Sequence, residues 1–156
     1  MIENLLKWKR YAKGFLIPVL SPNKMKPHVV AESILDIDFE GLKREGFRHV
    51  VFDKDNTLTD HDVHYIKESA FHEKIADVER IFGKDNVAVF TNNLVVTKIE
   101  DSHLQVISST VKKPDAGSVI ETFFNDRFSK SNSYCNKFYD ETSCVVIGDR
   151  LLTDVV

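Results

Sequence analysis

Apolar residues are arranged in two ways along the chain beyond residue 39. Short runs of apolar, mostly β-branched residues alternate with longer stretches in which apolar residues recur every three or four positions. The short runs predict buried strands, and the longer stretches predict amphipathic helices. The predicted strands are HVVFD (49–53), NVAVFTNN (86–93), QVISST (105–110) and SCVVIGD (143–149), and the predicted helices cover residues 40–45, 67–82 and 115–124.

This order of elements predicts the fold class. Strands that are apolar throughout and are separated by helices are typical of a parallel sheet covered on both faces. We therefore expect an α/β fold, a Rossmann-like three-layer sandwich around a parallel sheet. Gly46 is expected to cap the first short helix, and residues 129–143, rich in Ser, Asn and Lys, are expected to form a solvated loop.

The first twenty residues have a separate, basic pattern. Their apolar residues fall on one broad helical face, and Pro18 is expected to end the helix. The basic residues on or near the other face are Lys7, Lys9, Arg10 and Lys13. Such a helix is typical of a segment that lies in the interface of an anionic membrane, although packing on the domain and organelle targeting are alternatives. We divide the chain into this segment, 1–26, and a globular domain, 27–156.

Composition narrows the class of protein. The 156 residues are 42% hydrophobic and 29% charged, which suits one globular domain, and the formal net charge of −3 argues against general nucleic-acid binding. The two cysteines, Cys135 and Cys144, have no ligand spacing for zinc and are too few for a disulfide framework, so a reducing compartment is favoured. No apolar run reaches the roughly 18 residues of a membrane-spanning helix.

Polar residues gather where the predicted strands end. Asp53 and Asp55 follow the first strand, Thr91 ends the second, Asp149 ends the last, and Lys113 precedes a proline in the intervening region. Ligands bind at the carboxyl ends of the strands in open parallel sheets. Carboxylate oxygens suit Mg²⁺, and a hydroxyl with an ammonium group suits a phosphoryl group. The sequence therefore predicts a site for magnesium and phosphate at this edge.

Each of these residues also has an ordinary structural alternative. An Asp pair after a strand more often forms a turn or a helix cap, and taken alone Asp53 and Asp55 would have about one chance in ten of being catalytic. Lys113 alone would be a solvated lysine, and Lys112 is its rival for the same role. The order of the motifs along the chain and their place at strand ends favour the chemical interpretation.

At these positions the chain resembles the haloacid dehalogenase-like phosphatases, whose four motifs match in order. DKDNT (53–57) is similar to the first motif, Thr91 to the second and Lys113 to the third. GD (148–149) together with Asp154 is similar to the fourth. The match of four ordered motifs is far more specific than one Asp-x-Asp.

Within that superfamily the chain is similar to the mitochondrial and plastid phosphatidylglycerophosphate phosphatase branch and its bacterial relatives. The segments that carry this resemblance are PHVVAESILDID, FDKDNTLT, FTNN, KKPDAG and VIGDRLLTD. Lys54 and Asn56 are its most distinctive residues, because other members more often have an apolar residue and glycine there. The resemblance covers residues 27–154, except for 129–143.

The resemblance implies a mechanism at the two aspartates. Asp53 would be the nucleophile that forms an aspartyl-phosphate, and Asp55 would protonate the leaving alkoxide and then deprotonate the attacking water. Mg²⁺ would be bound by Asp53, by Asp55 through its backbone carbonyl, and by Asp149. Around them, Thr91, Asn92 and Lys113 would bind the substrate, Thr91 and Lys113 would also act in catalysis, and Asp154 would support Lys113 or a metal-bound water.

The resemblance also implies a substrate and a location. Residues 60–67 and 94–112 leave no room for the cap domain of many relatives, so the site is expected to be open and to suit a phosphate on a lipid headgroup. The chain is also expected to be C-terminally short, because such folds usually continue through a further helix and strand. The implied function is the conversion of phosphatidylglycerophosphate to phosphatidylglycerol on the matrix side of the inner mitochondrial membrane, in cardiolipin synthesis.

Two other functions stay open on the sequence. A phosphatase for proteins or small phosphate esters would use the same catalytic residues. A non-catalytic scaffold subunit, associated with a membrane, would keep the fold without turnover. A cytoplasmic, membrane-associated protein is the alternative location.

Overall fold

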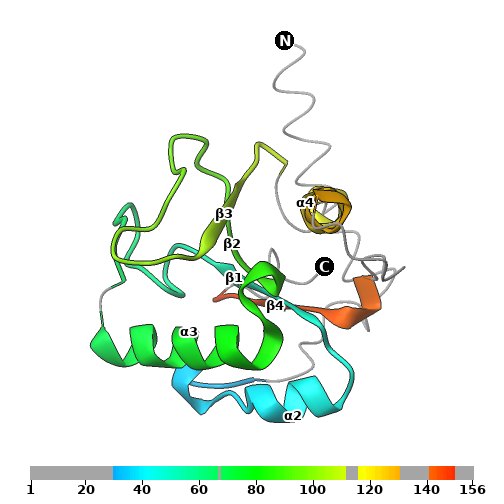
Figure 1. Ribbon diagram of the computed structural model, residues 1–156. Coiled ribbons are helices and arrows are strands. Elements are labelled where there is room, and N and C mark those ends of the chain that lie inside the picture. The colour runs from blue at the N-terminus through cyan, green and yellow to red at the C-terminus, as the bar shows by residue number, and fades with distance from the viewer. Residues whose placement is uncertain (1–29, 67, 112–115, 131–140, 150–156) are drawn as a thin grey trace, which may run out of the picture.

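A parallel sheet with helices on both faces forms the centre of the molecule (Figure 1). The structure is a computed structural model that describes residues 30–66, 68–111, 116–130 and 141–149. Its elements in chain order are η2 (Ile34–Asp36), α2 (Phe39–Arg44), β1 (His49–Asp53), α3 (Ser69–Phe82), η3 (Lys84–Asn86), β2 (Val87–Thr91), β3 (Gln105–Ser108), α4 (Gly117–Lys130), η4 (Glu141–Ser143) and β4 (Cys144–Ile147). The helix predicted in residues 1–20 lies outside the described residues.

The four described strands are all parallel and follow the order β3-β2-β1-β4. In this register Val50 of β1 lies beside Val87 of β2 and Val145 of β4, so β1 is paired on both edges. The predicted α/β fold with a parallel sheet is thus confirmed.

The loop predicted over 129–143 is wrong at both ends, because α4 continues to Lys130 and η4 begins at Glu141. Residues 118–130 contain neither Gly nor Pro, so nothing in them breaks the helix.

Two apolar cores lie on opposite faces of the sheet, because successive side chains of a strand point to opposite sides. Val50 and Phe52 of β1 join the larger core with α2 and α3, whereas Val51 joins the smaller core with α4. In Figure 1, α2 and α3 accordingly lie on one side of the strands and α4 on the other. The apolar residues at 50–52 of β1 and 87–90 of β2 are almost completely buried.

Capping interactions at both ends of α2 define where the helix begins and where the chain turns toward β1. Asp38 caps the helix, since its Oδ1 accepts a hydrogen bond of 2.8 Å from the backbone N–H of Gly41. Gly46 follows with a φ of 101°, and the N–H of Phe47 returns 3.2 Å to the carbonyl of Leu42. These features define a Schellman motif, which requires a left-handed residue at the position of Gly46. The predicted capping role of Gly46 is confirmed.

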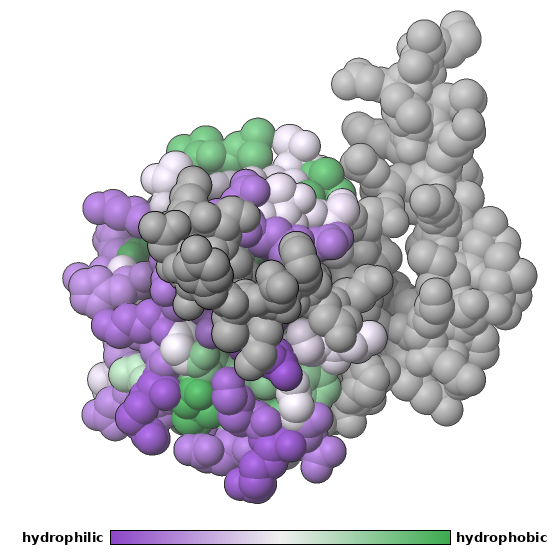
Figure 2. All heavy atoms as spheres, turned by 45° about the vertical axis from the view of Figure 1, so that its right-hand side comes forward, coloured by the Kyte–Doolittle hydropathy of each residue, from purple (hydrophilic) through white to green (hydrophobic). Residues whose placement is uncertain are grey.

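Polar residues predominate on the part of the described surface that Figure 2 shows. Figure 2 shows hydrophilic residues over much of one face, with apolar residues in small groups among them. The most exposed large apolar side chains are those of Val30, Tyr65, Leu94 and Val95, with 84%, 52%, 56% and 85% of their surface exposed. Within the described ranges, none of the helices combines the length and apolar character needed to cross a bilayer.

His49 is a buried histidine at the start of β1. It is 3% exposed, and its ring centroid lies 4.4 Å from that of Phe124 in α4. Burial, together with the nearby positive charges of Arg48 and Lys43, lowers the pKa of His49 from 6.5 to about 4. His49 is therefore a packing residue between β1 and α4.

This lowered pKa predicts an acid-sensitive fold. Between pH 6.5 and about pH 4 the unfolded chain binds a proton at His49 that the folded chain does not bind, so stability falls as the pH falls through this window. The shift corresponds to a loss of about 3 kcal/mol in the free energy of unfolding. Urea unfolding followed by circular dichroism at several pH values should show this slope, and His49→Gln should flatten it. An unchanged slope in the variant would contradict the role of His49.

Candidate functional site

The segment after β1 is a tight turn built on the backbone of Lys54. The N–H of Lys54 donates to the carbonyl of Phe90, 3.2 Å away, which continues the pairing of β1 with β2 by one residue. Its carbonyl accepts from the N–H groups of Leu58 at 3.1 Å and Thr59 at 3.0 Å. The chain therefore reverses immediately after Asp53, and the next few side chains stay at the strand end.

Asn56 sits at the position of the turn that needs a left-handed backbone. Its φ is 61°, and its N–H donates a hydrogen bond of 2.7 Å to the carbonyl of Thr59. Glycine adopts this conformation at no cost, and asparagine is among the few other residues that tolerate it. The turn thus keeps its shape with a residue other than glycine at this position.

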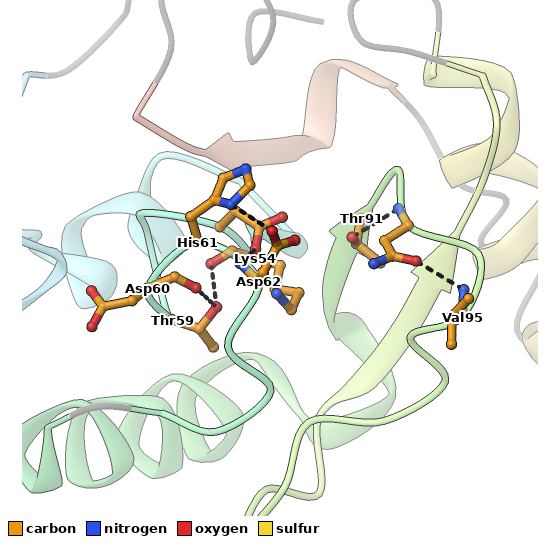
Figure 3. Close-up of polar contacts among 9 residues, drawn as sticks. Lys54, Thr59, Asp60, His61, Asp62, Thr91 and Val95 are labelled. Atoms are coloured by element: carbon orange, nitrogen blue, oxygen red, sulfur yellow. Dashed lines mark hydrogen bonds and ion pairs between the residues drawn. The ribbon is translucent and has the colours of Figure 1, made fainter.

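Asp55 is held by two donors on one oxygen. Its Oδ1 accepts from the ammonium group of Lys54 at 2.5 Å and from the backbone N–H of Asp62 at 3.2 Å. The side chain of Asp55 is 29% exposed, whereas that of Lys54 is 2% exposed. Figure 3 shows Lys54 and Asp62 together in the loop after β1. The carboxylate is therefore fixed in direction while part of it reaches solvent.

Thr91 ends β2 beside this turn. It is 2% exposed, and its Oγ1 accepts a hydrogen bond of 3.1 Å from the N–H of Asn93 (Figure 3). A hydroxyl group can accept and donate at once. Among the described residues the hydroxyl hydrogen of Thr91 has no acceptor, so it can donate to an oxygen of a ligand.

Asn92 joins two loops at the same edge of the sheet. Its Nδ2 donates to the carbonyls of Ser109 at 3.0 Å and Val111 at 2.8 Å, and both residues follow β3. Both amide hydrogens are therefore used within the protein. A contact of Asn92 with substrate stays a prediction, and it would have to use the side-chain oxygen or the backbone.

The sheet brings three of the predicted residues to neighbouring strand ends. Asp53 is the last residue of β1, and it pairs in register with Phe90, one residue before Thr91. On the other edge of β1, Phe52 pairs with Ile147, two residues before Asp149. Asp53 therefore lies between the ends of β2 and β4. The remaining predicted residues Lys113 and Asp154, and the rival Lys112, lie outside the described residues.

The oxygen atoms at this edge suit a magnesium ion. In the described parts of the chain no three His, Cys, Asp or Glu side chains form a cluster that could hold a metal ion. The predicted ligand set is different, because it uses two carboxylates, Asp53 and Asp149, with the backbone carbonyl of Asp55. No described donor reaches that carbonyl, and hard oxygen ligands are the ones that Mg²⁺ prefers. The donor set fits the ion.

Two features of the site were not predicted as functional. Lys54 was noted only as a distinctive residue, yet it is buried and ion-paired with Asp55. Its signal in the sequence is a charged residue placed between two aspartates directly after an apolar strand. The Oγ1 of Thr57 is also buried and has no hydrogen-bond partner in the described structure.

A family model and one curated relative match the chain. A model of the protein family described as mitochondrial PGP phosphatase matches residues 15–156. The chain is also 35% identical, over 141 residues, to phosphatidylglycerophosphate phosphatase 1, chloroplastic/mitochondrial, of Arabidopsis thaliana. That alignment covers 83% of this chain and 36% of the relative, so the chain spans about a third of the length of the curated protein that it matches. No solved structure matches the chain.

Proposed function

This chain belongs to the mitochondrial PGP phosphatase family, and from that membership we propose that it is a Mg²⁺-dependent phosphatase for phosphatidylglycerophosphate. The reaction would release inorganic phosphate and leave phosphatidylglycerol, through an aspartyl-phosphate intermediate. The observation that carries the proposal is the place of Asp53 at the end of the central strand, between the ends of β2 and β4, with Asp55 fixed beside it.

In the first step an oxygen of Asp53 attacks phosphorus, and the bond between phosphorus and the glycerol oxygen breaks. A carboxylate nucleophile divides one difficult hydrolysis into two easier displacements. Asp55 gives its proton to the leaving oxygen, so that an alcohol leaves and not an alkoxide. Thr91 donates a hydrogen bond to a phosphoryl oxygen, and Lys113 adds positive charge there.

In the second step water attacks the phosphorus of the aspartyl-phosphate and frees Asp53. Asp55, now ionised, takes the proton from that water and returns to its starting state. Asp53, Asp149 and the carbonyl of Asp55 would hold Mg²⁺, and its charge would reduce the repulsion between nucleophile and phosphate.

The loops around the strand ends favour a substrate with a bulky body. The segment after β1 contacts the segment after β2 through an isolated β-bridge between Tyr65 and Glu100. In this bridge the N–H of Glu100 donates a hydrogen bond of 2.7 Å to the carbonyl of His64. The described residues between β1 and α3, and those between β2 and β3, form no helix and no named strand. A site bordered by short loops accepts a headgroup that remains attached to a bilayer.

The proposed location is the mitochondrion, on the matrix side of the inner membrane, where the product would enter cardiolipin synthesis. The family description supports the organelle, and the substrate class supports contact with a membrane. Residues 1–20 are proposed to make that contact as a peripheral helix, on the basis of their sequence pattern.

A phosphate-release assay tests the proposed function. Phosphatidylglycerophosphate in mixed micelles should release phosphate in the presence of Mg²⁺, and removal of the ion with a chelator should stop the reaction until Mg²⁺ is added back. Soluble phosphate esters with alkyl and aryl leaving groups are assayed beside the lipid. Phosphate release from the soluble esters alone would indicate a small-molecule substrate and not the lipid. No release from any of these esters would contradict the proposed phosphatase activity.

The N-terminal segment carries a separate prediction. Deletion of residues 1–20 should abolish sedimentation with anionic liposomes and slow hydrolysis of the lipid, because each basic residue near such a surface contributes about 1 kcal/mol. Hydrolysis of a soluble aryl phosphate should stay near its original rate. Equal losses on both substrates would place the segment in the folded domain, and unchanged sedimentation would exclude it as the anchor.

A further inference from the structure

Lys54 is a buried lysine at the proposed catalytic centre. It is 1% exposed, and it is the only Lys, Arg, Asp or Glu among the buried residues of the described structure. Removing an ammonium group from water is costly unless it gains a charged or hydrogen-bonding partner. Packing alone therefore does not explain why a lysine is buried at this position.

The ammonium group of Lys54 has one acceptor in the described structure, and that acceptor belongs to Asp55. Its Nζ donates to Asp55 Oδ1 at 2.5 Å, and the backbone N–H of Asp62 donates to the same oxygen. Within the described residues no donor reaches Oδ2 of Asp55. The two oxygens are therefore unequal: Oδ1 is occupied by donors, and Oδ2 is the atom that can carry a proton.

The backbone of Lys54 fixes this contact to the sheet. Its N–H is bonded to Phe90 of β2, and its carbonyl accepts from Leu58 and Thr59 across the turn. The hydroxyl of Thr59 adds a contact of 3.3 Å to the same carbonyl. Since the root of the side chain cannot shift without loss of these bonds, the position of the ammonium group follows the end of β1.

We propose that Lys54 is a positioning residue for the acid and base steps of Asp55. By holding Oδ1, Lys54 sets the carboxyl group so that Oδ2 gives its proton to the leaving oxygen and later takes one from water. This role rests on the proposed function, because it needs a phosphoester as substrate. It differs from the role of a phosphate-binding lysine, which Lys113 is proposed to have.

A purely structural role for Lys54 makes a different prediction. Removal of one partner of a buried ion pair destabilises the fold, because the remaining charge is left without its partner. If the pair only packs the turn, replacement of Lys54 by methionine would change both ester classes equally. If Lys54 acts through Asp55, the loss depends on how much help the leaving group needs.

The test compares two leaving groups by kcat/KM, which reports the steps up to formation of the aspartyl-phosphate. Phosphatidylglycerophosphate has an alcohol leaving group that needs a proton, and p-nitrophenyl phosphate has one that leaves readily without it. Lys54→Met should lower kcat/KM for the lipid by about 10- to 100-fold, below the full value of acid catalysis, and for p-nitrophenyl phosphate by less than about threefold. Lys54→Arg should restore much of the loss, since it keeps a charged donor.

A double-mutant cycle tests whether the effect of Lys54→Met on activity acts through Asp55. In an Asp55→Asn background, Lys54→Met should cause little further loss on the lipid, because the proton that Lys54 helps to place is already absent. Lys74→Met is the matched control. Lys74 donates to the carbonyls of Leu35 and Ile37 on the α3 face of the sheet, so its loss tests packing without touching the turn.

The outcomes separate cleanly. Equal losses on both esters, or additive losses with Asp55→Asn, would overturn the positioning role. Selective loss in Lys74→Met would overturn it too, because the selectivity would then follow from general destabilisation. If Lys54→Met melts far below the unmodified chain, Lys54→Gln provides the same comparison with a polar side chain. An unmodified chain that hydrolyses neither ester would contradict the proposed function itself.

Discussion

Asp53→Asn is expected to abolish phosphate release. An amide cannot form the aspartyl-phosphate, and it is a weaker ligand for Mg²⁺, so the loss in kcat should exceed about 10⁴-fold, the scale seen when a nucleophile is removed from an enzyme. The fold should survive, because asparagine has nearly the same shape and Asp53 ends its strand at a partly exposed position. The rate is measured by phosphate release from the lipid and from p-nitrophenyl phosphate.

The control for this variant is Asp77→Asn. Asp77 lies on the exposed face of α3, where its Oδ1 accepts from Arg80 at 3.2 Å. Asp77→Asn removes one negative charge, as Asp53→Asn does, but at a position away from the strand ends. An exposed ion pair of this kind contributes at most about 1 kcal/mol to the free energy of unfolding. Activity close to that of the unmodified chain is expected. Retention of more than a few per cent of activity in Asp53→Asn, with an unchanged melting temperature, would remove the covalent mechanism.

Asp55→Asn is expected to cause the second largest loss. The amide can still accept from Lys54 at its oxygen, so the turn should keep its shape, but it can neither give nor take a proton. General acid and base help of this kind is typically worth about 10²–10⁴-fold. In this variant kcat/KM should fall further for the lipid than for p-nitrophenyl phosphate.

The second half of the reaction supplies an independent measurement for Asp55. With p-nitrophenyl phosphate the first step needs little acid help, whereas the attack of water still needs a base. Asp55→Asn should therefore accumulate phosphorylated protein, which acid quenching and mass spectrometry detect as an added phosphoryl group on the peptide that contains Asp53. A loss of less than about tenfold on the lipid, without accumulation, would assign the proton transfers to another residue.

The fold could be predicted from the sequence because its strongest features are local. The apolar runs at 50–52 and 87–90 fill both faces of a parallel sheet, so they are continuous and easy to recognise. The ends of these runs carry Asp53 and Thr91, and strands that run in one direction must bring such residues to the same edge. Gly46 was equally predictable, since a helix end needs its backbone conformation.

The roles of Lys54 and Asn92 depend on tertiary contacts and could not be predicted in the same way. A lysine next to a turn is ordinarily solvated, and only the packing of the turn shows that Lys54 is buried. Asn92 donates to residues 17 and 19 positions further along the chain, and no local pattern encodes such a bond. The last part of α4 has one apolar residue, Phe128, among polar ones, so its continuation to Lys130 gave only a weak signal.

The pairing of β1 with β4 also affects the order in which the sheet can form while the chain is being synthesised. His49 of β1 pairs with Cys144 of β4, 95 positions later, whereas Val50 pairs with Val87 much earlier in synthesis. A nascent chain that has emerged only to β3 therefore exposes one edge of the strand that carries Asp53. Such edges invite pairing with other chains, and contacts this distant in sequence form slowly. Chaperones that shield strand edges should thus associate with nascent chains of intermediate length and release them once β4 has been synthesised.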